Sequence, residues 1–166
     1  MKWHIMGWIA AEIGLAIVLA LVIRHYFFLF VLVKGRSMQP TLENEDIMFV
    51  RRCRRRPVRR GDIVICRFPR TKHMLVKRVI ALPGEEISIQ DGRACIGGMP
   101  LNESYARISP RQKMEARRMK AGEYFVLGDN RLSSRDSRSL GPLRVEDICG
   151  RCISIVLPLR RRRRLG

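Results

Sequence analysis

The strongest constraint on this chain is an apolar run over residues 5–23, which only Glu12 interrupts. In helical form this run extends roughly 30 Å, the thickness of the hydrocarbon core of a bilayer. We therefore expect a membrane anchor over residues 1–33, with one transmembrane helix at about 5–23. A cleavable signal peptide is the main alternative, but the apolar run continues past Ala20 to Ile23 instead of breaking there. A buried core helix is the remaining alternative.

The charges beside this run do not decide which side of the membrane the rest of the chain occupies. Lys2 and His4 give weak support for a cytoplasmic N-terminus, whereas the basic region after the run favours the opposite orientation. Long domains cross membranes largely regardless of their charge, so the positive-inside rule does not settle the question.

After the anchor, short β-prone runs alternate with Gly, Pro and Asn turns, which is typical of a mainly antiparallel β domain. Residues 87–90 alternate cleanly and meet Asp91 and Gly92, a hairpin turn signal that predicts a return strand at 94–96. Residues 102–121 are polar and basic, and we expect a loop or a short surface helix there. The other predicted strands lie at residues 47–50, 62–68, 74–82, 124–127 and 152–157.

Positive charge is concentrated in two blocks of a chain whose formal net charge is +18. Seven Arg lie between residues 51 and 60, and five fill residues 160–164. Such blocks bind anionic lipid headgroups or nucleic acid, although a solvated surface accounts for them equally well. No helix-turn-helix, zinc finger or aromatic-basic platform accompanies the charge, so we expect membrane lipids rather than nucleic acid as partners.

Five cysteines occur, at positions 53, 66, 95, 149 and 152. Cys149 and Cys152 form a C-x-x-C motif, but no second pair completes the four ligands of a structural zinc site. Small buried apolar residues, or one incidental disulfide, are the favoured interpretation. We expect no metal and no cofactor.

Ser37 and Lys77 are the candidates for chemistry. Ser37 lies between Gly35 and Pro40, and Gln39 and Pro40 exclude the G-x-S-x-G and S-x-x-K nucleophile motifs. Lys77 shares one face of its predicted strand with apolar neighbours, where burial would lower its pKa by the two to three units, roughly, that a base near neutrality needs. A lysine that extends from an outer face into solvent is the alternative. A Ser-His-Asp triad through His73 is less favoured.

Four stretches in a fixed order carry a family resemblance: residues 37–42 (SMQPTL), 61–64 (GDIV), 77–84 (KRVIALPG) and 128–138 (GDNRLSSRDSR). Together with the N-terminal apolar run, they resemble the type I signal peptidases, the membrane-bound serine proteases that remove signal peptides. The short, Gram-positive-type members are the most similar. The match extends over nearly the whole chain.

The resemblance implies a role for each matching residue. Ser37 would be the nucleophile and Lys77 the neutral general base of a Ser-Lys dyad. Ser134 would hydrogen-bond the Lys77 amine. Asp129 and Arg138 would form an ion pair that holds the last stretch in place.

It also implies a domain organisation and a location. An extracytoplasmic, mainly β catalytic domain would occupy residues 34–166, with a smaller inserted β lobe at about 84–122. The anchor would cross the cell membrane once, with the N-terminus in the cytoplasm.

Two positions depart from the family pattern. Gly35 stands where several members carry a Ser that assists the oxyanion hole, so the Ser37 N–H would carry more of that task. Glu85 stands where an Asp is usual.

The expected substrates are the signal peptides of exported preproteins, bound in extended form and cleaved after Ala-x-Ala-like sites. Shallow apolar pockets would select the small side chains, and the resemblance places Met38, Leu42, Leu75 and Val76 around them. Two other functions remain as alternatives. One is a LexA-like self-cleaving protease, and the other is a basic, membrane-anchored protein that binds lipid or nucleic acid without catalysis.

Overall fold

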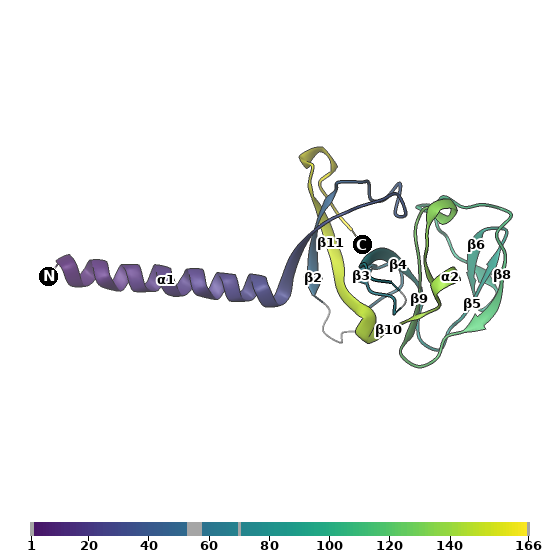
Figure 1. Cartoon of the computed structure of the whole chain (residues 1–166), viewed down its shortest axis with the longest axis horizontal. Helices are drawn as coiled ribbons and strands as arrows, with labels where there is room; N and C mark the ends of the chain where they lie inside the picture. Colours follow the sequence, from purple (N-terminus) through teal and green to yellow (C-terminus); the bar gives the residue numbers. More distant parts are fainter. Residues whose placement is uncertain (1, 53–57, 70, 166) are drawn as a thin grey trace.

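Antiparallel strands are the main regular secondary structure after residue 27 in the computed structural model, which describes residues 2–52, 58–69 and 71–165 (Figure 1). Residues 53–57, which include Cys53 and three of the seven arginines of the basic block at 51–60, lie outside the described residues. The mainly antiparallel β fold that the short alternating runs predict is confirmed.

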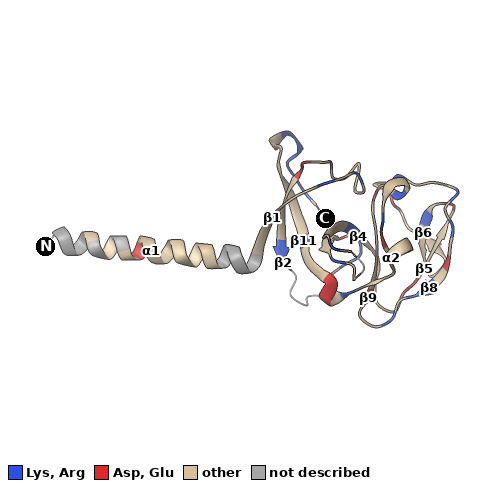
Figure 2. Cartoon of the chain, in the orientation of Figure 1, with Lys and Arg blue, Asp and Glu red and all other residues tan. Residues whose placement is uncertain are grey.

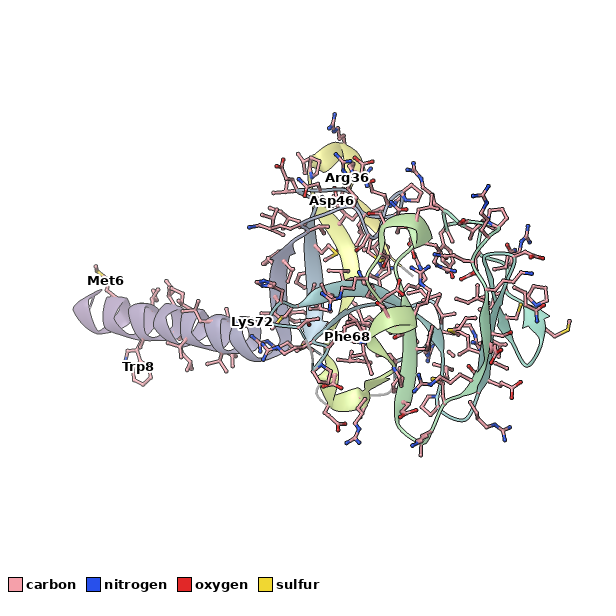
Figure 3. All side chains as sticks on the ribbon, turned by 45° about the vertical axis from the view of Figure 1, so that its right-hand side comes forward. Met6, Trp8, Arg36, Asp46, Phe68 and Lys72 are labelled. Atoms are coloured by element: carbon pink, nitrogen blue, oxygen red, sulfur yellow. The ribbon has the colours of Figure 1, made fainter. Side chains whose placement is uncertain are left out.

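The apolar run forms helix α1 (Lys2–Phe27), which extends away from the strands (Figure 1). Its apolar side chains are largely exposed, and Met6 and Trp8 project from it in Figure 3. The transmembrane helix expected at 5–23 is not confirmed. In the parts of the chain that the structure describes, no helix combines the length and apolar character needed to cross a membrane.

The larger sheet has eight strands in the order β1-β2-β11-β3-β4-β9-β10, with β12 paired to β11. All of its neighbouring strands pair in antiparallel fashion. Its strands are β1 (Phe28–Leu32), β2 (Ile47–Arg52), β3 (Ile63–Cys66), β4 (Leu75–Ala81), β9 (Glu123–Leu127), β10 (Leu143–Arg144), β11 (Ile148–Leu157) and β12 (Arg163–Arg164). Strand β1 continues directly from α1 and was not predicted, because its aromatic run is no less apolar than the helix before it.

The smaller sheet has four strands in the order β7-β6-β5-β8. These are β5 (Glu86–Gln90), β6 (Arg93–Ile96), β7 (Met99–Pro100) and β8 (Met114–Arg118). The β5–β6 hairpin predicted from Asp91 and Gly92 is confirmed. The loop or helix expected over 102–121 is wrong at β8, because that strand lies at the sheet edge and exposes most of its charged side chains, which hides the alternation of a strand.

Three apolar clusters hold these sheets together. The first joins β2 and β11 to the segment after β1, the second lies between β3, β4 and β9, and the third packs the smaller sheet against β4 and β9. Strand β4 therefore has packed side chains on both faces, and Val79, Ile80 and Ala81 are fully buried. A short helix, α2 (Ser137–Leu140), follows the loop after β9.

Among the cysteines that the structure describes, Cys66, Cys95 and Cys149 are free thiols. Burial raises the pKa of Cys66 to about 12, so this thiol stays protonated at neutral pH. Cys66, Cys95 and Cys152 are buried, as expected of small apolar residues in a core.

Candidate active site

Ser37 lies in the loop that connects β1 to β2. Gly35 has a φ of 100°, a conformation that other residues rarely adopt, and its N–H donates to Asn44 Oδ1 at 3.0 Å. This φ gives a physical reason for a glycine two residues before Ser37. Met38 follows Ser37 with its side chain in the first apolar cluster, which fixes the loop beneath the hydroxyl.

Lys77 projects from the middle of β4, where its backbone pairs with Val64 of β3. Only 2 % of this residue is exposed. Burial lowers the pKa of Lys77, and it outweighs the opposing effect of the nearby Asp136 and Asp129 carboxylates. The neutral amine is therefore easier to reach near neutral pH than it is for a lysine in water.

These two side chains meet although 40 residues separate them in the sequence. Lys77 Nζ lies 2.8 Å from Ser37 Oγ, which is hydrogen-bonding distance. A neutral amine at this distance can accept the hydroxyl proton and leave a nucleophilic alkoxide.

The backbone around Ser37 is held by the start of the 128–138 loop. Asn130 N–H donates to the Ser37 carbonyl at 3.0 Å, and Asn130 Nδ2 donates to the Arg36 carbonyl at 3.2 Å. The Ser37 N–H itself has no hydrogen-bond acceptor among the described residues. It is free to donate to an oxyanion beside Ser37 Oγ.

Gly128 makes this close approach possible. A Cβ at this position would lie 2.2 Å from Ser134 Oγ and 2.5 Å from the Ser37 carbonyl oxygen. Glycine is therefore required for the end of β9 to lie against the nucleophile loop.

The structure corrects the ion pair expected between Asp129 and Arg138. Asp129 is fully buried and accepts two hydrogen bonds from Arg78, at 2.9 Å from Nε and 2.7 Å from Nη2. The reason lies in the strand pairing: Arg78 on β4 is the partner of Leu127 on β9, close to Asp129. Arg78 also stacks over the Tyr105 ring, 4.0 Å from its centroid.

Arg138 pairs instead with Asp136, two residues before it, with Nε 2.8 Å from Oδ1. Asp136 is fully buried and also accepts hydrogen bonds from the Gly128 N–H at 3.0 Å and from Ser134 Oγ at 2.6 Å. The hydrogen bond expected between Ser134 and Lys77 is thus replaced by one from Ser134 to Asp136. Asp136 is the centre of this loop, a position that composition alone did not single out from its polar neighbours.

A groove of about 420 Å³ opens beside Ser37 and Lys77. The segment after β1 and the beginning of β4 form its two walls, and Met38, Leu75 and Val76 are among the residues that line it. Leu42 does not line the groove. Its N–H donates to the Met38 carbonyl, and this turn directs the side chain into the first apolar cluster, where it is fully buried.

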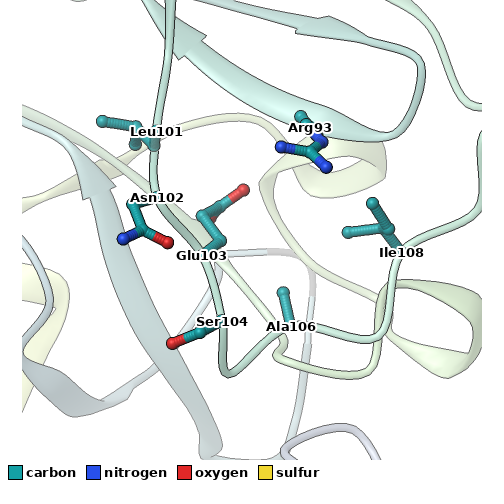
Figure 4. A pocket seen from close by; sticks show the side chains of 7 residues that line it. All are labelled: Arg93, Leu101, Asn102, Glu103, Ser104, Ala106 and Ile108. Carbon is teal, nitrogen blue, oxygen red and sulfur yellow. The ribbon is translucent and has the colours of Figure 1, made fainter.

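A second hollow, of about 260 Å³, lies between the smaller sheet and the segment after it (Figure 4). Its carboxylate, Glu103, already accepts hydrogen bonds from Arg131, the Ala94 N–H and Tyr105. The Glu103–Arg131 ion pair is buried, and it connects the segment after the smaller sheet to the 128–138 loop.

Comparison with known proteins gives matches over most of the chain. The family model described as signal peptidase, peptidase S26, matches residues 5–157. Signal peptidase I of Leptolyngbya laminosa is 36% identical over 164 residues, covering 93% of this chain and 81% of its own. Signal peptidase I T of Bacillus subtilis (strain 168) is also 36% identical, covering 88% and 82%.

A solved structure supports the same relationship. The crystal structure of a signal peptidase I from Enterococcus faecalis V583 superposes with a TM-score of 0.52 at 29% identity, covering 58% of this chain and 97% of the other. Fold, site and relatives together define the class of this protein as a serine peptidase. The chain belongs to the signal peptidase family, peptidase S26.

Proposed function

We propose that this chain is a membrane-bound endopeptidase that removes N-terminal signal peptides from exported preproteins, with Ser37 as nucleophile and Lys77 as general base. Membership of the signal peptidase family supports the removal of signal peptides. The observation that carries the dyad is the 2.8 Å separation of Lys77 Nζ and Ser37 Oγ in buried surroundings.

The reaction is an acyl transfer. Lys77 takes the proton of Ser37, and Ser37 Oγ attacks the scissile carbonyl carbon. The Ser37 N–H stabilises the oxyanion that forms. As the peptide C–N bond breaks, Lys77 returns its proton to the leaving amine. It then takes a proton from a water that hydrolyses the acyl-enzyme, which restores the Ser37 hydroxyl.

The substrate binds in extended form between the two walls of the groove. Residues 31–35 and 74–77 supply backbone edges on either side, so main-chain pairing tolerates varied sequences. Met38, Leu75 and Val76 line shallow apolar subsites, which favour small side chains and hence Ala-x-Ala-like sites.

We also propose that the enzyme works at a membrane. The exposed apolar side chains of α1 need an apolar partner, and the acyl chains of membrane lipids can supply it. The division into an anchor at 1–33, a catalytic domain at 34–166 and an inserted lobe at about 84–122 belongs to this proposal. The extracytoplasmic side of the catalytic domain stays a prediction, which protease accessibility in intact cells tests.

Cleavage of a purified preprotein tests the dyad. Ser37→Ala and Lys77→Ala should each lower kcat by at least about a thousandfold, since each removes a group that acts in bond making. Ser104→Ala and Lys113→Ala change the same residue types at exposed positions and should cleave at the wild-type rate. Full cleavage by Lys77→Ala would refute the base, and no cleavage by the wild type would favour a membrane-anchored binding protein.

A further inference from the structure

The segment after β11 has no role in the function proposed so far. It begins at residue 158, where the match to the family model has ended. It contains helix η3 (Leu159–Arg161) and strand β12, which turns back along β11. Figure 2 shows basic residues at the turn that follows β11.

Arg161 makes the most extensive contact of this segment. Its Nε lies 2.9 Å from Asp46 Oδ1 and its Nη2 lies 3.1 Å from Asp46 Oδ2, so the pair is bidentate. Its Nη1 donates to Glu43 Oε1 at 2.8 Å. The Asp46 side chain is only 1 % exposed, whereas Arg161 is 22 % exposed. Arg161 therefore compensates a carboxylate that is almost completely removed from water.

Asp46 lies at the end of the loop that carries Ser37, where hydrogen bonds join the two ends of the loop. The Val33 N–H donates to the Asp46 carbonyl at 2.8 Å, and the Glu45 N–H donates to the Val33 carbonyl at 2.9 Å. Asp46 Oδ2 also accepts from the Glu43 N–H at 2.8 Å. Figure 3 labels Asp46 near the top of the view, close to the label of Arg36 from the same loop. Residues 33–46 thus form a closed loop with the Arg161–Asp46 pair at its base.

One further contact of the segment reaches the same loop, and a second reaches the apolar cluster in which that loop is packed. Arg163 Nη2 donates to the Thr41 carbonyl at 2.6 Å. Leu165 packs against the first apolar cluster, which includes Met38 and Leu42 on either side of this turn. The loop is therefore held by the C-terminal segment at its base and by Asn130 at Ser37 itself.

We propose that the C-terminal segment positions the nucleophile, with Arg161 and Arg163 as positioning residues that hold the 33–46 loop so that Ser37 meets Lys77. The inference rests on the proposed Ser-Lys chemistry. It gives a role in that chemistry to residues that lie after the part of the chain matched by the family model. A nucleophile displaced by about 1 Å can lose on the order of a hundredfold in rate, so contacts that fix this loop act on kcat.

The test measures kcat and KM for preprotein cleavage with the full-length chain. Arg161→Ala should lower kcat at least about tenfold and change KM less, because strands β1 and β4, which also line the groove, keep their pairing with β2 and β3. Arg161→Lys keeps the charge but loses the bidentate geometry, so it should recover part of the rate. Arg160→Ala and Arg162→Ala remove the same charge from exposed neighbours on the segment and should match the wild type.

A second readout separates positioning from stability. The rate at which a small p-nitrophenyl ester acylates Ser37, with release of p-nitrophenolate, needs no preprotein binding, and it should fall with kcat when each protein is assayed well below its Tm. Wild-type kcat and acylation rates per folded molecule in Arg161→Ala would overturn the inference. If Arg161→Ala does not fold, Arg163→Ala decides. Its side chain is exposed and makes one contact with the loop, and an unchanged kcat in that variant would overturn the proposal.

Failure of the inference and failure of the proposed function give different results. If the wild type neither cleaves the preprotein nor becomes acylated at Ser37, the proposed function is wrong. If the wild type does both and the Arg161 and Arg163 variants match Arg160→Ala, only the positioning role is wrong.

Discussion

At the scale of single residues, the buried lysine links catalysis to stability. Burial lowers the pKa of Lys77 in the folded state, whereas in the unfolded chain the pKa is about 10.4. Between these two values the unfolded chain binds more protons, so the free energy of unfolding of the wild type rises with pH in that window. Each unit by which the pKa is lowered corresponds to about 1.4 kcal/mol.

Lys77→Met keeps the length of the side chain and removes its charge. We expect this variant to be more stable than the wild type at pH 7 and to lack the rise with pH, as measured by urea denaturation between pH 6 and 10. Lys113→Met, at an exposed position, should retain the wild-type slope. A Lys77→Met protein with the same slope would show that the amine is not desolvated.

The rate should follow the same ionisation. Only the neutral amine can accept the Ser37 proton, so kcat/KM should rise with pH and level off above the lowered pKa of Lys77. The midpoint of this acid limb should lie below about 10.4, the value of a lysine in water. If kcat/KM does not change with pH anywhere below about 10.4, Lys77 is excluded as the base of the free enzyme.

Sequence reasoning selected two residues that the structure brings together, but it did not find the pairing of the charged residues around them. Ser37 and Lys77 stood out because a loop serine and a strand lysine fit a known pattern of chemistry, and the structure brings them together. The partners of Asp129 and Arg138 were assigned wrongly. Several arginines and carboxylates gather here, and their pairing depends on how β4 and β9 lie side by side, which the local sequence does not state.

At the scale of elements, the junction of β9 with the nucleophile loop is the most sensitive point. Gly128→Ala would place a methyl group against Ser134 Oγ and the Ser37 carbonyl, so one of the two segments must move. We expect kcat for preprotein cleavage to fall about a hundredfold, as for a nucleophile displaced by roughly 1 Å. Gly122→Ala is the matched control, because its φ of 75° costs stability but its Cβ meets open space. Equal kcat values for the two variants would contradict this account.

Strands could be predicted where apolar and polar residues alternate along them. They could not be predicted where only the pairing with a neighbouring strand defines them. The β5–β6 hairpin has a turn signal and clean alternation, and it was found with nearly the observed bounds. Strand β8 pairs with β5 at a sheet edge and presents charged residues to solvent, so only its tertiary partner shows that it is a strand. Strand β1 is defined by its pairing with β2, a contact that apolar composition does not specify.

At the scale of the whole molecule, the general class of fold and of enzyme could be predicted, but the long-range ties could not. Four ordered motifs identify the family, and short runs and turns predict most of the strands. The ion pair between Arg161 and Asp46 joins positions 115 residues apart. A run of five arginines gives no indication of which one has a buried partner, because only the fold distinguishes Arg161 from Arg160 and Arg162.

Helix α1 carries most of the exposed large apolar side chains in the part of the chain that the structure describes. Large apolar residues such as Ile13 and Ile17 are more than half exposed. Burying each in acyl chains would contribute roughly 1.5–3 kcal/mol, so a lysine at both positions should weaken binding to phosphatidylcholine vesicles by at least about a hundredfold. Flotation of the full-length protein with such vesicles measures this. Met99→Lys changes an apolar residue that is 72 % exposed on the smaller sheet, and it should float like the wild type. Equal flotation of all three proteins would show that the catalytic domain, rather than α1, carries the affinity for lipid.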